Sequence, residues 1–236
     1  MKQLPLAMRL RERALFDSFL AGANAATVEQ LRALALEGRA GTYWLSGPGG
    51  VGKTHLLQAT CALAASAGAE TAFLPLSLLQ PLGPAVLEGW QHARLLALDD
   101  VAVIAGQDEW ERSLFRLHRE AEERGAALLA AAPPPPRLLR FSLPDLASRL
   151  AAATLLPLRA LDESEQRQAL QLRARQRGLT LPEETALYLQ RRFRRELPAL
   201  YELLDALDEA ALQAQRRLTV PFIRQVLASR SLPDAE

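Results

Sequence analysis

A glycine-rich loop constrains this chain more than any other feature of its sequence. Residues 47–54 read Gly-Pro-Gly-Gly-Val-Gly-Lys-Thr and fit the pattern G-x-x-x-x-G-K-[ST] at every fixed position. A short apolar run at 42–46 precedes the loop, and a helical pattern at 53–67 follows it. Such glycines let backbone N–H groups converge on phosphates, and a helix N-terminus adds favourable partial charge. The loop therefore predicts a nucleotide-binding strand, loop and helix.

Two side chains of this loop have distinct predicted roles. Lys53 would neutralise the β- and γ-phosphates, and the Thr54 hydroxyl would ligate Mg²⁺. Lys53 is one of only two lysines among the 28 basic residues of the chain, which otherwise uses arginine. A compact ammonium suits a place between phosphates better than a planar guanidinium does. The predicted nucleotide contacts in this stretch are Gly47, Pro48, Gly49, Gly50, Val51, Gly52, Lys53, Thr54 and His55.

A second motif follows about 45 residues later. The apolar run 94–98 ends in Asp99 and Asp100, as a buried strand of the Walker B type does. Asp99 is predicted to lie beside the nucleotide and to bind the Mg²⁺ ion with its coordinating water. Asp100 is predicted to be a catalytic residue that orients or polarises the attacking water. The two motifs together predict a site for ATP or ADP with Mg²⁺.

The pattern of the chain changes near residue 160. Before it, predicted strands at 42–46, 71–74, 94–98, 126–131 and 154–158 alternate with predicted helices at 27–37, 53–67, 83–90 and 109–124. After it, only helices are predicted, at 162–177, 182–194, 196–216 and 220–229. The prediction is an α/β fold with a parallel sheet between helices, followed by a small all-helical domain. We place an N-terminal tail at 1–22, the α/β core at 23–160 and the helical domain at 161–236.

Composition narrows the classes of function. The net charge is +1, which gives no general attraction to nucleic acid, so direct sequence-specific DNA binding is not expected. No stretch reaches the roughly 20 apolar residues of a membrane span, and no signal peptide is visible, so we expect a cytoplasmic protein without a membrane role. The single Cys61 excludes an internal disulfide, and the three histidines lie too far apart in sequence to indicate a metal site or a triad.

The order of these motifs resembles the AAA+ module of the bacterial replication initiator DnaA, and more closely the short DnaA-related regulators of the Hda family. The resemblance covers nearly the whole chain. Its most specific stretches are Leu-Pro-Asp-Leu-Ala-Ser-Arg-Leu at 143–150, Leu-Gln-Leu-Arg-Ala-Arg at 170–175 and Ala-Gln-Arg-Arg-Leu-Thr-Val-Pro-Phe at 214–222. The resemblance implies an AAA+ P-loop fold with a helical lid. It also implies a negative regulator of replication initiation that binds nucleotide, with ADP as the favoured state.

The resemblance gives two further arginines a role. Arg149 corresponds to the arginine finger, a catalytic residue that reaches a neighbouring protomer's γ-phosphate. Arg195 corresponds to the lid arginine that contacts the bound nucleotide. Without the family, each would count as one of many solvent-facing arginines. The chain is thus expected to stimulate hydrolysis of ATP held by the DnaA initiator and to have weak activity of its own.

The N-terminal tail resembles a peptide that binds the replicative sliding clamp, the beta subunit of DNA polymerase III. Residues 3–8 read Gln-Leu-Pro-Leu-Ala-Met. Gln3, Leu4, Leu6 and Met8 are the predicted clamp contacts, with Leu6 and Met8 in an apolar pocket and the Gln3 amide at its rim. The alternatives for this stretch are an unstructured tail and a leucine that docks on the core of the chain itself.

The sequence leaves two other functions open. One is a DnaA-like initiator or helicase-loader ATPase module, and the other is a different clamp-tethered AAA+ adaptor or a self-sufficient ATPase switch. Residues 128–133 read Leu-Leu-Ala-Ala-Ala-Pro, where members of the family usually carry a small polar residue that positions the lytic water. This departure predicts slow hydrolysis at the chain's own site. A homo-oligomer remains open as well.

Overall fold

The computed structural model describes residues 14–90, 92–192, 197–214 and 218–230. These residues form two compact units. The first comprises residues 24–158 with the short segment up to Phe16, and the second comprises residues from 159 onward with 17–23. No helix in the described part of the chain is long and apolar enough to cross a lipid bilayer.

The first unit is built on a sheet of five parallel strands. They are β1 (Gly41–Ser46), β2 (Thr71–Pro75), β3 (Leu95–Asp99), β4 (Ala127–Ala132) and β5 (Thr154–Pro157), in the spatial order β2-β3-β4-β1-β5. Each lies within about two residues of its predicted position, which confirms the α/β fold class. Because β4 lies between β1 and β3, the segments that follow these three strands meet at one edge of the sheet.

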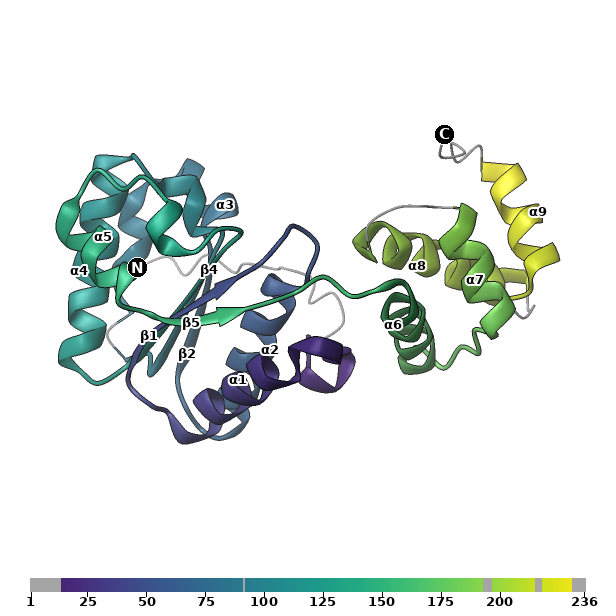
Figure 1. Ribbon diagram of the computed structural model, residues 1–236, viewed down its shortest axis with the longest axis horizontal. Helices are drawn as coiled ribbons and strands as arrows, with labels where there is room; N and C mark the ends of the chain where they lie inside the picture. The colour runs from purple at the N-terminus through teal and green to yellow at the C-terminus, as the bar shows by residue number, and fades with distance from the viewer. Residues whose placement is uncertain (1–13, 91, 193–196, 215–217, 231–236) are drawn as a thin grey trace. The chain divides into compact units, whose positions relative to one another are not determined.

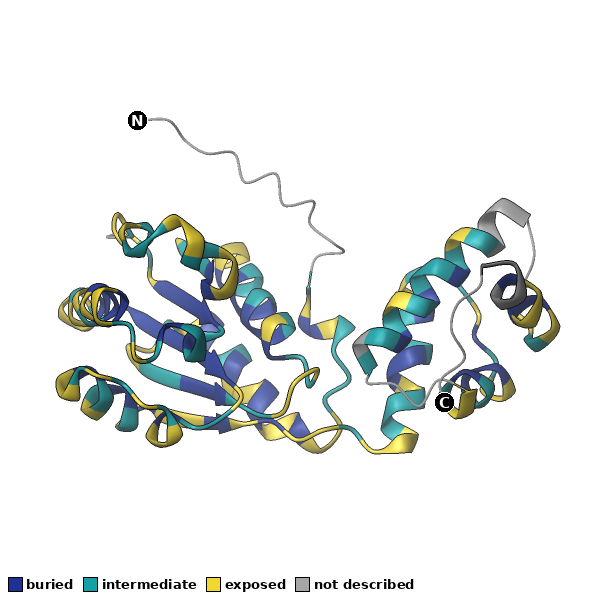
Figure 2. Ribbon diagram, turned by 90° about the horizontal axis from the view of Figure 1, so that it is seen from above, coloured by how far each residue is buried: buried dark blue, intermediate teal, exposed yellow. Residues whose placement is uncertain are grey.

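Helices cover both faces of this sheet (Figure 1). The helices α1 (Ala25–Glu37) and α2 (Lys53–Ser66) pack on one face, and α4 (Asp108–Glu123) and α5 (Pro144–Ala151) on the other. The central strands β3 and β4 are buried between the two layers, whereas the outer faces of the helices are exposed (Figure 2). Central strands that are apolar throughout, such as β4 with Ala-Leu-Leu-Ala-Ala-Ala, follow from this double coverage.

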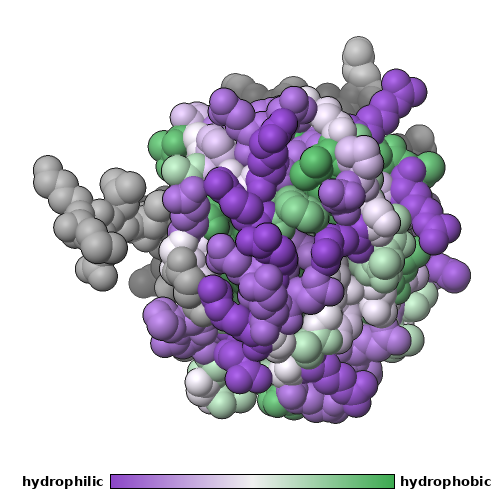
Figure 3. All heavy atoms as spheres, turned by 90° about the vertical axis from the view of Figure 1, so that its left-hand side faces the viewer, coloured by the Kyte–Doolittle hydropathy of each residue, from purple (hydrophilic) through white to green (hydrophobic). Residues whose placement is uncertain are grey.

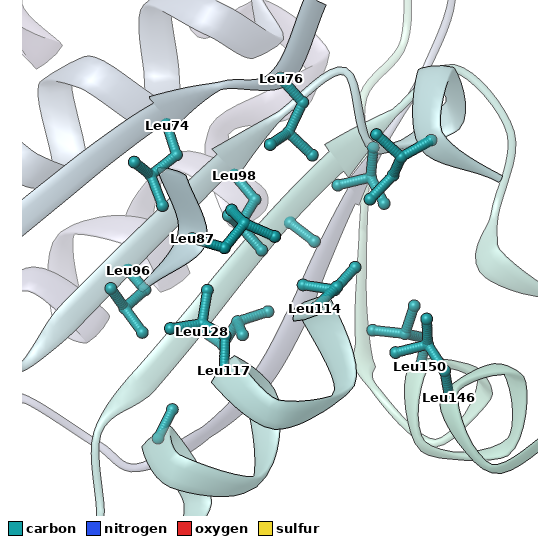
Figure 4. Packing of buried hydrophobic residues seen from close by; sticks show 14 of the residues in the cluster. Leu74, Leu76, Leu87, Leu96, Leu98, Leu114, Leu117, Leu128, Leu146 and Leu150 are labelled. Carbon is teal, nitrogen blue, oxygen red and sulfur yellow. The ribbon is translucent and has the colours of Figure 1, made fainter. Parts of the chain in front are cut away.

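The core on the α4 and α5 side is made largely of leucines (Figure 4). Leu96 and Leu98 of β3 and Leu128 of β4 face Leu114 of α4, and all four are at most 1% exposed. Burying one such side chain contributes roughly 1.5–3 kcal/mol to the free energy of unfolding. Leu146 and Leu150, both fully buried, fix α5 to the same core. This packing anchors the two helices that carry the residues discussed below.

Two segments of the first unit differ from the sequence prediction. The predicted helix at 83–90 is wrong, because the region instead forms a short α3 (Leu76–Leu79) and two 3-10 turns, η3 (Gln80–Leu82) and η4 (Pro84–Leu87). Prolines 81 and 84 lack the N–H groups that an α-helix needs, and Gly83 has a φ of 85° between them. The helix α5 and the 3-10 turn η5 (Val101–Ile104) had no predicted counterpart.

The second unit consists of four helices, as predicted, within the described residues. They are α6 (Glu163–Gln176), α7 (Glu183–Arg192), α8 (Leu197–Ala214) and α9 (Val220–Arg230). Their shared core includes Leu170, Leu189, Leu204 and Ile223, each at most 1% exposed. The predicted N-cap of α6 is confirmed, because the Asp162 carboxylate accepts the Glu165 N–H and the Glu165 carboxylate accepts the Asp162 N–H.

Residues 17–23 belong to the helical unit through contacts with α6. The Ala23 N–H donates to Glu165 Oε1 at 3.2 Å, and Gln176 Nε2 donates to the Asp17 carbonyl at 3.0 Å. Within the same unit, Arg173 forms a bidentate pair with Asp205, at 2.9 and 3.2 Å, which joins α6 to α8. Polar contacts therefore fix both the entry to α6 and its outer face.

Candidate functional site

The glycine loop connects β1 to α2, as its pattern predicts. Gly47 follows β1, and a Cβ placed on it would lie 2.6 Å from the Leu158 carbonyl oxygen, so no side chain fits there. Gly52 is the N-cap residue of α2 and has a φ of 97° and a ψ of 22°, a backbone conformation that favours glycine. These two glycines allow the loop to turn tightly over the first turn of α2, where free N–H groups can bind an anion.

Lys53 is folded onto this loop. Its ammonium donates to the Gly47 carbonyl at 2.8 Å and to the Pro48 carbonyl at 2.7 Å, and the residue is 8% exposed. Burial lowers the pKa of Lys53, and the negative charges of Asp99 and Asp100 act in the opposite direction. The lysine is thus held at the centre of the loop, beside the two predicted Walker B carboxylates.

Thr54 and Asp99 meet at the edge of the sheet. Thr54 Oγ1 donates to Asp99 Oδ2 at 2.5 Å, and the Asp99 side chain is almost completely buried at the end of β3. Burial raises the pKa of Asp99, while the hydrogen bond from Thr54 lowers it and the charge of Asp100 raises it. The structure therefore joins the ends of two motifs that lie 45 residues apart in the sequence.

Asp100 has an unusual backbone conformation. Among the described non-glycine residues it alone has a positive φ, with φ 56° and ψ 41°. Its N–H donates to Asp99 Oδ1 at 3.1 Å, and it is the N-cap residue of η5. Left-handed backbone at a non-glycine residue costs of order 1–3 kcal/mol and is concentrated at functional sites. The turn directs the chain away from β3 immediately after the two carboxylates.

The segment that follows β4 contributes backbone carbonyls rather than side chains. The Gly47 N–H donates to the Pro133 carbonyl at 3.1 Å, and the indole N–H of the fully buried Trp44 donates to the Pro134 carbonyl at 3.0 Å. The prolines therefore lie directly beside the start of the glycine loop. The sequence identified the missing polar residue here but gave no sign that these carbonyls would bind β1 and the loop.

The oxygen ligands at this edge fit a magnesium ion. The Thr54 hydroxyl and the Asp99 carboxylate lie within hydrogen-bond distance of each other, and Mg²⁺ prefers hard oxygen ligands of this type together with nucleotide phosphates and water. When bound, the ion would neutralise phosphate charge. The loop N–H groups and Lys53 would then bind the phosphates, and Asp100, directly after Asp99, stays the residue predicted to orient water.

The other predicted contacts are His55, Arg195 and the clamp-binding residues of the tail. The His55 ring Nε2 lies 2.9 Å from the Leu15 carbonyl, so this side chain is directed toward the segment before α1. Arg195 lies outside the described residues, as do the clamp-binding residues Gln3, Leu4, Leu6 and Met8.

Arg149 lies on α5 and contacts α4. Its guanidinium pairs with the Glu122 carboxylate and lies 5.5 Å from the centre of the Phe115 ring. The side chain of Arg149 is 38% exposed and that of Glu122 is 60% exposed, so the pair is accessible to solvent. Neither Glu122 nor Phe115 was singled out from the sequence, because no motif marks them.

Arg149 and the glycine loop lie at opposite ends of the parallel strands. A cavity of about 360 Å³ is lined by Arg149 and Glu122 together with Gly41, Thr42 and His118. Gly41 and Thr42 begin β1, whereas the glycine loop follows its other end. Five steps of about 3.3 Å along β1 separate the two edges by roughly 17 Å. Arg149 therefore lies far from the phosphate site of its own chain.

The face of the molecule that carries α4 and α5 is largely hydrophilic, with apolar side chains in separate patches (Figure 3). A groove of about 560 Å³ on this face is lined by Phe115, Leu143 and Pro84 together with Arg112, Arg116 and other polar side chains. Phe115 thus links Arg149 to a groove lined by two arginines and apolar side chains, a composition that is common at protein interfaces.

The comparisons with known proteins agree with this architecture. Residues 162–227 match the family model described as the lid domain of Hda. Domain III of the Thermotoga maritima replication initiation protein DnaA aligns with a TM-score of 0.80 and 19% identity, over 94% of this chain and 99% of that one.

Two more solved structures share the fold. DnaA from Aquifex aeolicus, bound to AMPPCP, aligns with a TM-score of 0.69 and 20% identity, over 84% of this chain and 66% of that one. The Holliday junction branch migration motor RuvB from Thermotoga maritima aligns with a TM-score of 0.57 and 14% identity, over 89% of this chain and 68% of that one. Residues 162–227 of this chain thus match the lid domain of Hda, and the chain as a whole shares the fold of domain III of DnaA.

Proposed function

We propose that this chain is a regulator of chromosomal replication initiation that acts on DnaA. In this proposal it holds an adenine nucleotide, with ADP as the resident form, and docks on the DNA-loaded sliding clamp through Gln3, Leu4, Leu6 and Met8. It then presents Arg149 to ATP bound by DnaA and stimulates hydrolysis of that ATP. The initiator loses its active form, and a second initiation is prevented.

The location of Arg149 is the observation that carries the proposal. The guanidinium is partly exposed and lies at the amino ends of β1 and β4, roughly 17 Å from the edge that holds the glycine loop. It therefore cannot reach a phosphate in its own site, and only a nucleotide on another molecule can accept it. An arginine finger supplied in trans in this way raises hydrolysis by about 10³–10⁵-fold in well-studied cases.

The nucleotide part of the proposal rests on the geometry of the loop and on a relative. Lys53, Thr54, Asp99 and Asp100 converge at one edge of the sheet, beside a helix N-terminus. DnaA from Aquifex aeolicus, which shares the fold, binds the ATP analogue AMPPCP. The proline segment after β4 offers no side chain to position water, which favours a retained nucleotide over a rapidly hydrolysed one.

The test measures hydrolysis of ATP that has been preloaded on DnaA, in the presence of the DNA-loaded clamp and an excess of this protein over DnaA. Arg149→Ala should abolish the stimulation and leave binding to the clamp unchanged. Arg119→Ala is the matched control, because Arg119 is an exposed arginine on α4 in an ion pair with Glu123. Unchanged stimulation by Arg149→Ala would rule out the finger role.

Clamp binding is tested separately, with the wild-type chain and the double variant Gln3→Ala, Leu6→Ala. The variant should lose clamp affinity and should lose stimulation only in the assay that includes the clamp. Equal clamp binding by both proteins would contradict the tail assignment. Robust ATP turnover by the chain alone, lost on Asp100→Ala, would instead favour a self-sufficient ATPase switch.

A further inference from the structure

Glu111 is a fully buried carboxylate that neither the sequence motifs nor the nucleotide site accounts for. It lies in the first turn of α4 and is 0% exposed. Its Oε1 accepts the N–H groups of Gly106 at 2.6 Å and Ser142 at 3.0 Å, and its Oε2 accepts the Leu143 N–H at 2.7 Å. Hydrogen bonds to an ionised carboxylate are about twice as strong as neutral ones. One buried side chain therefore holds two separate backbone segments.

Each of these segments leads to a part of the functional site. Gly106 follows η5, the turn that begins directly after Asp99 and Asp100. Ser142 and Leu143 lead into α5, and Leu143 is the N-cap residue of that helix. Arg149 lies six residues after Leu143, in a helix of only eight residues. The start of this helix thus depends on Glu111, since the side chain of Leu143 supplies no polar cap.

We propose that Glu111 is a positioning residue for Arg149. The three hydrogen bonds fix the first residues of α5 against α4 and against the turn that follows the Walker B carboxylates. The direction of α5, and with it the position of the Arg149 guanidinium on the surface, follows from this attachment. The inference rests on the proposed role of Arg149 and adds a residue that acts through it without touching the nucleotide.

The chemistry of the contact requires a carboxylate. A glutamine at 111 would present an NH₂ group to at least one of the three donors, so a buried N–H would face another donor and stay unpaired. The core below the helix would remain, because Leu146 and Leu150 are fully buried against it. We therefore expect Glu111→Gln to keep α5 packed while its first turn loses its fixed direction.

The experiment compares wild type, Glu111→Gln and Glu109→Gln in three measurements. Glu109 lies on the same helix and is exposed, so the control makes the same chemical change without touching the buried contact. Hydrogen exchange at residues 106 and 142–143 reports the attachment, binding of fluorescent ADP reports the nucleotide site, and hydrolysis of DnaA-bound ATP reports Arg149. Arg149→Ala and the double variant with Glu111→Gln complete the set.

In Glu111→Gln, we expect the amide hydrogens at 106 and 142–143 to exchange faster and ADP to bind as it does in wild type. Hydrolysis of DnaA-bound ATP should be stimulated about 10–100-fold less, since a displacement of about 1 Å can cost that much. The double variant should bind ADP as Arg149→Ala does, because a residue that acts only through Arg149 leaves the nucleotide site unchanged. A merely structural role would lower ADP binding and stimulation together in Glu111→Gln, and would lower ADP binding in the double variant as well.

Two results separate the failure of this inference from that of the proposed function. If wild type stimulates through Arg149 and Glu111→Gln does so equally, only the role of Glu111 is overturned. If wild type shows no stimulation that depends on Arg149, the proposed function fails and the role of Glu111 fails with it. Should Glu111→Gln not fold, Glu111→Asp keeps the charge but is one methylene shorter, and the stimulated rate should fall in the same direction.

Discussion

The ion pair between Arg149 and Glu122 restrains the arginine that we propose to act on a partner. To reach a nucleotide on another molecule, the guanidinium must leave the Glu122 carboxylate and the Phe115 ring. Glu122→Gln removes the charge of the acceptor and keeps its size and the aromatic contact. The variant therefore weakens one of the two contacts that hold Arg149 on its own surface.

The size of the effect follows from the exposure of the pair. With side chains that are 38% and 60% exposed, solvent screens the interaction, and an exposed pair is worth about 0–1 kcal/mol. The contact with Phe115 at 5.5 Å, worth about 0.5–1 kcal/mol, is unchanged by the substitution. Releasing Arg149 from Glu122 should then lower the concentration of chain needed for half-maximal stimulation by up to about 5-fold.

The assay is stimulated hydrolysis of DnaA-bound ATP as a function of chain concentration. Glu122→Gln should reach the same maximal rate as wild type at a lower concentration, and its melting temperature should change little. The difference should shrink as the ionic strength rises from about 0.05 to about 0.5 M, because salt screens the wild-type pair. Glu123→Gln, which alters the adjacent exposed pair with Arg119, should behave like wild type.

A lower maximal rate in Glu122→Gln would refute this reasoning. It would mean that Glu122 holds Arg149 in the position that the partner requires, so that the pair is part of the active arrangement. A shift of half-maximal concentration to higher values would have the same meaning.

Three further predictions concern buried groups. Burial lowers the pKa of His118 below 6.5; Glu122 opposes this shift and Arg149 adds to it. As the pH falls, His118 is therefore protonated in the unfolded chain before it is protonated in the folded one. The free energy of unfolding should then decrease as the pH drops below about 6.5. Urea midpoints at about pH 7.5 and about pH 5.5 should differ less in His118→Gln than in wild type. Burial raises the pKa of Cys61 to about 12, so a thiol reagent at neutral pH should modify it only after unfolding, and rapid labelling of the native protein would contradict its position. Lys53→Ala should weaken ADP binding on the order of 100-fold in a fluorescence titration, since it removes a charge-assisted contact with phosphate, and binding within a few-fold of wild type would contradict the site.

The core fold and the nucleotide motifs could be predicted because local sequence patterns determine them. The glycine loop has to follow a strand and begin a helix, and the apolar runs of the central strands are typical of a sheet covered on both faces. The same reasoning gave the N-cap of α6 at Asp162. Short-range chemistry and periodicity therefore account for the sheet and for the meeting of Thr54 with Asp99.

The contacts that depend on tertiary packing could not be predicted in this way. Glu111 reads from the sequence as one more acid in the first turn of a helix, where acids favour the dipole, and nothing local shows that the amides of Ser142 and Leu143, 31 and 32 positions away, will meet it. The pairing of Arg149 with Glu122 joins residues 27 positions apart on two helices. The failed helix at 83–90 has the opposite cause, since Gly83 and Pro84, with Pro81 just before them, were local signals for turns.

The proline carbonyls beside the glycine loop have a consequence for how long a nucleotide stays. Pro133 and Pro134 lie between the ends of β1 and β3, and their carbonyls accept from the Gly47 N–H and the Trp44 ring N–H, so this segment offers no polar side chain to orient water. In the proposed function we expect ATP bound here to be hydrolysed slowly, and the resident ADP to stay bound as a prosthetic group does. At about 100 times its dissociation constant, such a ligand adds roughly 2.7 kcal/mol to the free energy of unfolding. The amount of folded protein in the cell would then follow the supply of adenine nucleotide.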